Sequence, residues 1–133
     1  MVVEVRPEDI PLKGVEYVPS LQINDGDGNE NESEALKVMY YQEMLERMCW
    51  QQGNMKQTAP AQRMTDFVRG HISYDLPRSS YAPGLLSSPL HGWMPSGIAG
   101  RLRKGFETFG RQRRGFLTDE ALVIGVETRT SAP

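Results

Sequence analysis

The chain has 133 residues, of which 38% are hydrophobic, so it can form one domain with a thin core and has no room for a second. Its 15 basic and 17 acidic residues leave a formal net charge of -2, which gives no general attraction to nucleic acid or to an anionic membrane. One cysteine, Cys49, cannot form an internal disulfide, and with two histidines a structural zinc site is not expected. We therefore expect a reduced, cytoplasmic setting without a membrane span or an export signal.

Strand-like sequence stands near both ends of the chain. Residues 2–6 alternate apolar and polar side chains and stop at Pro7, and residues 121–130 form a second β-branched stretch. We predict that residues 2–6 and 122–128 pair as a short sheet. Two origins fit this pattern equally well: a subdomain inserted into a larger sheet protein, or a small free-standing domain whose terminal strands pair.

The first helix is predicted to begin after Asn31 or Ser33, where a glutamate follows as in a capping box, and to end at Gly53 and Asn54. Apolar side chains four residues apart, widened by two neighbours, form its expected buried face: Leu36, Met39, Tyr40, Met44, Leu45 and Met48.

Two further helices are predicted. One covers residues 58–70, with Thr58 as N-cap and Pro60 in the first turn. The other begins at Ser96 and runs to Gly110, and its internal Gly100 implies that another backbone packs close or that the helix is short. Residues 71–94 are expected to be an extended connection.

These elements predict an α+β fold that is mostly helical, with three main helices around a methionine and aromatic stripe and a short terminal sheet. Residues 1–133 are expected to form one domain, in which residues 24–34 are a flexible acidic loop. Asp25 to Asn29 place oxygen ligands as a calcium loop does, but Glu30 stands where that loop needs glycine and Leu36 where it needs an acid. An acidic turn before the first helix is the preferred interpretation.

The segment 101–114 is strongly basic around Phe106 and Phe109. Its cations are Arg101, Arg103, Lys104, Arg111, Arg113 and Arg114. Arginine pairs well with phosphate oxygens, so a dinucleotide, RNA or an acidic protein surface could bind here. The alternative is a solvated outer face, which we favour because the net charge is negative and no RNA-binding signature accompanies the cluster.

No catalytic constellation is apparent in the sequence. His71 and His91 have no nucleophile or carboxylate at diagnostic spacing, so we interpret them as ordinary polar residues. The chain carries neither a Gly-x-Gly-x-x-Gly turn nor a phosphate-binding loop of the Gly-x4-Gly-Lys type. We therefore do not expect this chain alone to be an enzyme.

Three segments together resemble one protein family. They are residues 59–63 (APAQR) followed by Asp66 and Phe67, residues 80–84 (SYAPG), and residues 125–131 (GVETRTS). With the surrounding sequence they resemble the C-terminal part of uncharacterised FAD-dependent dehydrogenases of bacteria, a branch related to flavoproteins with an inserted domain. In that family the dinucleotide-binding motif lies on the N-terminal side, outside the present segment.

The resemblance implies a cap inserted between two strands of a flavin domain. FAD would belong to the parent protein, and the cap would cover the substrate side of the flavin and position a small-molecule substrate, with the flavin-binding domain of the same chain as its partner. The fragment alone is expected to be inactive and to bind no FAD. The resemblance places Glu127, Arg129, Thr130 and Ser131 in the flavin or substrate cleft, or alternatively at the domain junction.

A second functional hypothesis comes from a different class. The chain could be a stand-alone interaction module that binds RNA or an acidic partner through residues 101–114. Binding to a polyanion that weakens steeply with salt would favour this module over the cap.

Overall fold

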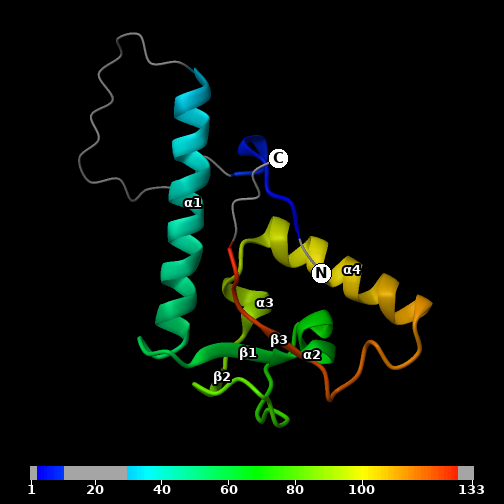
Figure 1. The fold of residues 1–133 in the computed structure, drawn as a ribbon. Coiled ribbons are helices and arrows are strands. Elements are labelled where there is room, and N and C mark those ends of the chain that lie inside the picture. The colour runs from blue at the N-terminus through cyan, green and yellow to red at the C-terminus, as the bar shows by residue number, and fades with distance from the viewer. Residues whose placement is uncertain (1–2, 11–29, 129–133) are drawn as a thin grey trace.

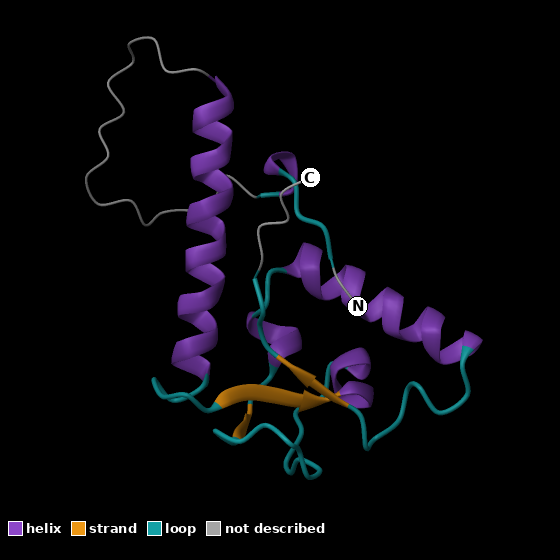
Figure 2. Cartoon of the chain, in the orientation of Figure 1, coloured by secondary structure: helices purple, strands orange, loops and turns teal. Residues whose placement is uncertain are grey.

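The computed structural model describes residues 3–10 and 30–128 of the chain (Figures 1 and 2). These residues form an α+β fold, as predicted. In chain order the elements are the short 3-10 helix η1 (Pro7–Asp9), α1 (Glu30–Gln52), β1 (Ala59–Arg63), α2 (Met64–Arg69), β2 (Leu85–Ser87), α3 (Leu90–Trp93), α4 (Ser96–Gln112) and β3 (Leu122–Ile124).

The three strands form one mixed sheet with β1 in the centre, in the order β2-β1-β3. β1 runs parallel to β2, with Ala59 opposite Leu85, and antiparallel to β3, with Ala61 opposite Ile124. The pairing with β3 continues beyond the strand ends, because Gly125 donates its N–H to the Pro60 carbonyl at 3.0 Å. Helices and loops therefore meet around a small sheet whose central strand contacts both others.

The predicted pairing of the two terminal segments is wrong. Residues 3–6 form no strand, and the partner of β3 is β1. Backbone acceptors near the N-terminus bind side chains instead: the Glu4 carbonyl accepts from Arg101 at 2.8 Å, and the Pro7 carbonyl accepts from Lys37 at 2.9 Å. These side-chain bonds hold the segment against α1 and α4 without a sheet ladder.

The helix predicted for residues 58–70 is also wrong in its first half. Residues Ala59–Arg63 are strand β1, and only Met64–Arg69 are helical. Pro60 is compatible with the central strand because its carbonyl accepts the hydrogen bond there and no N–H is required. Pairing with segments far along the chain therefore outweighs the local helix signal.

Helix α1 is confirmed, and its predicted buried face is correct in part, because it included Leu45 but not Tyr41. Tyr41 and Leu45 are its buried apolar residues, whereas Leu36 and Met39 are more than two-fifths exposed. Ile10, from the end of η1, packs on the Tyr41 side and selects that face. Residues 30–34 of the predicted acidic loop belong to this helix, and residues 24–29 lie outside the described part.

Helix α4 begins at Ser96, as predicted, and continues to Gln112. The close backbone approach expected at Gly100 is absent, since a Cβ there would meet nothing within 4 Å. The connection over residues 71–94 is more structured than expected, because it contains β2 and α3. Within α3, Leu90 is fully buried.

The core consists of two apolar clusters. The larger one lies between the sheet and the helices that follow it, and its buried members are Met64, Phe67, Leu90, Met94, Ala99, Phe106 and Val123. The smaller one joins η1 to α1 through Ile10, Tyr41 and Leu45. Ile98 and Val126 pack against both clusters, so the two halves are continuous.

Candidate functional site

The centre of the candidate site is the end of β1, where consecutive side chains point to opposite sheet faces. Gln62 is fully buried on the face toward α3, and Arg63 lies on the other face beneath two loops. Both residues belong to the APAQR segment. β1 therefore presents a polar group to each face of the sheet.

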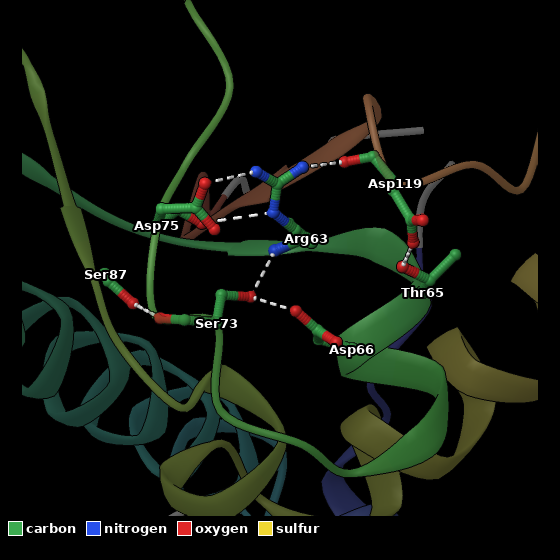
Figure 3. A network of polar contacts seen from close by, with 7 residues as sticks. All are labelled: Arg63, Thr65, Asp66, Ser73, Asp75, Ser87 and Asp119. Atoms are coloured by element: carbon green, nitrogen blue, oxygen red, sulfur yellow. Dashed lines mark hydrogen bonds and ion pairs between the residues drawn. The ribbon is translucent and has the colours of Figure 1, made fainter.

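Arg63 joins two loops that are distant in sequence (Figure 3). Its guanidinium donates to the Asp75 carbonyl through Nε at 3.1 Å and to the Asp75 carboxylate through Nη2 at 3.0 Å. Nη1 donates to the Asp119 carbonyl at 2.6 Å. The Arg63 side chain is 18% exposed while that of Asp75 is 84% exposed, so the loop covers the cation. Each of the three guanidinium nitrogens, Nε, Nη1 and Nη2, therefore donates a hydrogen bond within the protein.

The backbone beside Arg63 enters the same network (Figure 3). The Arg63 N–H donates to Ser73 Oγ at 2.9 Å, and Ser73 Oγ donates to Asp66 Oδ2 at 2.7 Å. The Ser87 hydroxyl donates to the Ser73 carbonyl. On the other side, Thr65 Oγ1 donates to Asp119 Oδ1 at 2.5 Å. The network therefore fixes β1, the start of α2, β2 and the turn before β3 to one another.

This network is suited to positioning rather than to covalent catalysis. Ser73 is 3% exposed, and its hydroxyl already accepts from a backbone N–H and donates to Asp66. A nucleophile must reach its substrate, which this serine does not. We conclude that the network gives the sheet and its loops one rigid arrangement.

On the opposite face Gln62 holds His91. The Gln62 amide nitrogen lies 2.7 Å from His91 Nδ1 and also donates to the His71 carbonyl at 2.6 Å, while its oxygen accepts the His91 N–H at 3.3 Å. His91 Nδ1 is therefore an acceptor, and the neutral ring carries its proton on Nε2. Burial, then the charges of Arg103 and His71, lower the pKa of His91 below 6.5.

Of the residues that the resemblance placed in a cleft, Glu127 lies within the described part of the chain. Glu127 is exposed just after β3. Its neighbour Thr128 donates its hydroxyl to Glu46 of α1. Arg129, Thr130 and Ser131 lie outside the described residues, so their predicted role stays a prediction.

The basic segment divides into several environments. Arg101 bonds Asp9 at 2.6 Å, and this hydrogen bond lowers the pKa of Asp9 below its usual range. Arg103 is half-buried on the inner side of α4. The remaining cations, Lys104, Arg111, Arg113 and Arg114, are exposed. The predicted outer face is thus present and includes Arg101, which is exposed although it pairs with Asp9, whereas Arg103 is not part of it.

The three segments that carry the sequence resemblance meet at β1. Ala59 donates its N–H to the Gly84 carbonyl at 3.1 Å, and Pro60 accepts from Gly125 at 3.0 Å. Gly84 and Gly125 thus bind neighbouring residues of β1. In the sequence, Gln62 and Arg63 stand out only as members of the APAQR segment. Asp75 and Asp119 were not predicted, because they lie in loops where no hydrophobic periodicity marks a residue as functional.

Comparison with known proteins agrees with this convergence. Residues 1–130 match the family described as FAD-dependent protein, C-terminal domain-like. The chain belongs to this family. An uncharacterized protein of Clostridium beijerinckii (strain ATCC 51743 / NCIMB 8052) is 30% identical over 103 residues, which cover 76% of this chain and 19% of that relative. The chain therefore spans about a fifth of the length of the relative it matches.

The described residues of this FAD-dependent family member do not fit a complete FAD site. β1 passes directly into α2 without the glycine-rich turn that receives a pyrophosphate. Within residues 3–10 and 30–128, no group of three or more His, Cys, Asp or Glu side chains could hold a metal ion. None of the helices in the described ranges is both long and apolar enough to cross a membrane.

Proposed function

We propose that this chain is the substrate-side cap of an FAD-dependent oxidoreductase of the dehydrogenase type. The observation that carries the proposal is the family match over residues 1–130, which assigns the chain to FAD-dependent proteins. The flavin would supply the hydride chemistry from the flavin-binding domain of the same chain. The cap residues would exclude water and position a small-molecule substrate.

The packing of residues near the two ends of the described part supports attachment of this domain to the flavin-binding domain at one place. Val5, before η1, and Val126, after β3, pack against the same cluster of Ile10, Tyr41 and Leu45. A domain whose entering and leaving segments lie together can be joined to a neighbouring domain through one connection. Adjacent ends of this kind suit a domain inserted between two strands of another domain.

The outer face of α1 supports a docking surface for the flavin-binding domain. Leu36, Met39 and Trp50 are 41%, 43% and 51% exposed. At 100° per residue they fall on one side of the helix, opposite Tyr41 and Leu45. A helix with apolar residues on two sides is normally covered on both. The flavin-binding domain is the proposed cover, because the matching relative has most of its length outside this region.

The cleft side of the cap would include Glu127, Arg129, Thr130 and Ser131. Glu127 is exposed immediately after β3, close to the Val126 packing point. The carboxylate of Glu127 and the guanidinium of Arg129 could together orient a polar substrate by charge-assisted hydrogen bonds. Their proposed task is positioning at the boundary between the two domains.

Iodide quenching of flavin fluorescence in the full-length protein tests the cap. Trp50→Ser should loosen the docking face and raise the quenching constant, because iodide then reaches the flavin. Tyr74→Ser is the matched control, since Tyr74 is 96% exposed on a loop. Unchanged quenching in Trp50→Ser, with normal FAD content, would contradict the docking face. Quenching that stays unchanged when the whole segment 1–133 is removed from an FAD-loaded protein would contradict the cap itself.

A polyanion titration of the 133-residue chain separates the cap from the interaction module. The cap hypothesis expects no measurable binding at low salt. Binding that falls steeply as salt rises would instead favour RNA or an acidic partner on residues 101–114.

A further inference from the structure

One buried amide serves three partner groups at once. The Gln62 nitrogen has two hydrogens, one for the His71 carbonyl at 2.6 Å and one for Nδ1 of His91 at 2.7 Å. The Gln62 oxygen accepts the backbone N–H of His91 at 3.3 Å. Gln62 has no exposed surface, so water does not replace these partners. The set of bonds is complete only while Nδ1 of His91 carries no proton.

A proton on Nδ1 leaves the amide without a satisfactory orientation. In the present orientation the new N–H of His91 would face the amide hydrogens of Gln62. After a half-turn of the amide, its oxygen would accept this N–H but would stand against the His71 carbonyl, and its nitrogen would face the backbone N–H of His91. Each orientation therefore brings at least one pair of like groups together, and buried groups left unpaired are costly.

The charged groups that act on His91 lie on or next to the helices that pack on α3. Helix α3 contacts α2, α4 and β1. Burial lowers the pKa of His91 below 6.5, and the charges of Arg103 in α4 and of His71 after α2 lower it further. Asp66 of α2 acts in the opposite direction, and β1 contributes the uncharged Gln62 amide. The ring is therefore neutral above pH 6.5, where the three bonds are intact.

Helix α3 also contacts the segment that follows β3. Leu90 of α3 is fully buried and packs on Gly125, because a Cβ on Gly125 would stand 2.8 Å from Leu90 Cδ2. The same Cβ would lie 3.7 Å from the Trp93 ring. Gly125 in turn donates its N–H to the Pro60 carbonyl at 3.0 Å. Gly125 therefore lies between β1 and α3.

We propose that Gln62 and His91 form a latch that is closed while Nδ1 of His91 is bare and opens when this nitrogen takes up a proton. Opening weakens the attachment of α3 and of the His71 segment to β1, and it loosens Gly125. Helix α1 stays folded, because it carries none of the three bonds and packs in the cluster of Ile10, Tyr41 and Leu45. The latch uses contacts of this chain alone and does not depend on the proposed cap function.

Hydrogen exchange of single amides in the 133-residue chain tests the latch. The His91 amide donates to Gln62, and the Met94 amide donates to the Leu90 carbonyl at 3.0 Å. Their protection factors, corrected for the intrinsic rate at each pH, are followed by NMR from about pH 7.5 to about pH 5, which spans the ordinary histidine pKa. We expect both to fall by about tenfold or more, because the open state binds the proton more tightly. The Leu45 amide of α1 should keep its protection.

Two variants separate the latch from general effects of acid. His91→Asn places an amide oxygen where Nδ1 stands, so it accepts the Gln62 hydrogen but does not titrate. Protection of the Met94 amide should then be independent of pH. His71→Asn is the matched control, because the His71 side chain is exposed and the change keeps the backbone carbonyl that bonds Gln62. The response to pH should remain in that variant.

Three exchange results would overturn the proposal: constant protection of Met94 across the pH range in the unchanged chain, a loss in His91→Asn as steep as in the unchanged chain, or an equal loss at Leu45. The last result would mean global unfolding. Nitrogen NMR shifts of the ring give a second measurement, which needs no variant. Above pH 6.5 they should show the Nε2–H tautomer of His91, and an Nδ1–H tautomer would refute the latch even if His91→Asn does not fold.

Discussion

The amide nitrogen of Gln62 lies 2.7 Å from Nδ1 of His91, and the amide oxygen of the same side chain accepts the His91 backbone N–H at 3.3 Å. A second hydrogen of the amide goes to the His71 carbonyl at 2.6 Å. Gln62 has no exposed surface. One buried side chain therefore holds α3 and the segment after α2 against β1.

Replacing Gln62 should destabilise the fold. Gln62→Leu keeps a similar volume but leaves the His91 N–H and the His71 carbonyl without their partner, which should lower the free energy of unfolding by about 2–3 kcal/mol. Urea unfolding measures the change. Gln112→Leu, at the exposed end of α4, is the control and should stay within about 0.5 kcal/mol. A similarly small change in Gln62→Leu would show that the amide bonds contribute little.

Stability should fall as the pH drops below the ordinary histidine range. The pKa of His91 is lowered from 6.5 by burial first, and then by Arg103 and His71. The unfolded chain therefore binds a proton at a higher pH than the folded one, and stability present above 6.5 is lost as the pH falls toward the lowered value. Denaturant unfolding at several pH values across this window measures the slope. His91→Gln should flatten it; an equal slope in that variant would assign the effect to other groups.

Two glycine-to-alanine changes should have opposite effects. Gly100 is exposed inside α4 with nothing within 4 Å of a Cβ, so Gly100→Ala should stabilise the protein by about 0.5–1 kcal/mol. A Cβ on Gly53 would stand 2.2 Å from the Thr58 carbonyl oxygen, so Gly53→Ala should destabilise by about 1–3 kcal/mol. Thermal unfolding of both variants checks the signs. Stabilisation by Gly53→Ala would contradict the packing at Gly53, and destabilisation by Gly100→Ala would contradict the open space at Gly100.

The guanidinium geometry of Arg63 should be required for loop order. Arg63→Lys retains the charge but cannot reach the Asp75 carbonyl, the Asp75 carboxylate and the Asp119 carbonyl together. We expect a loss of about 1–3 kcal/mol and faster amide hydrogen exchange around both loops. Arg78→Lys, at an exposed position, supplies the matched control. Exchange rates that are equal in the two variants would show that Arg63 does not order the loops.

Local signals in the sequence predicted the long helices but not the sheet. Ser96 after Pro95 marked the start of α4, and Gly53 after Gln52 marked the end of α1. β1 was misread because Pro60 after Thr58 is also a typical helix start. Its true partners lie beyond residue 84. β2 has three residues, too few for a periodic pattern, whereas β3 lies inside the strand predicted for residues 122–128 and only its pairing partner was wrong.

The candidate site was predictable only in part. Gln62 and Arg63 were identified within the APAQR segment by resemblance, whereas their roles depend on partners that no spacing rule connects. Asp119 reaches Arg63 because β1 and β3 pair, and that pairing could not be read locally. Asp75 reaches the same guanidinium from the loop between α2 and β2. The burial of Arg103 likewise depends on which face of α4 meets α2.

The position of β1 in the chain has a consequence during synthesis. Ala61 pairs with Ile124, and Met64 donates to the Ala121 carbonyl, so the central strand is made long before its antiparallel neighbour. Until that neighbour has left the ribosome, β1 keeps an open edge that can recruit a foreign strand. The emergence of β3, rather than that of α1, should therefore set the moment at which the nascent domain becomes resistant to proteases and to aggregation.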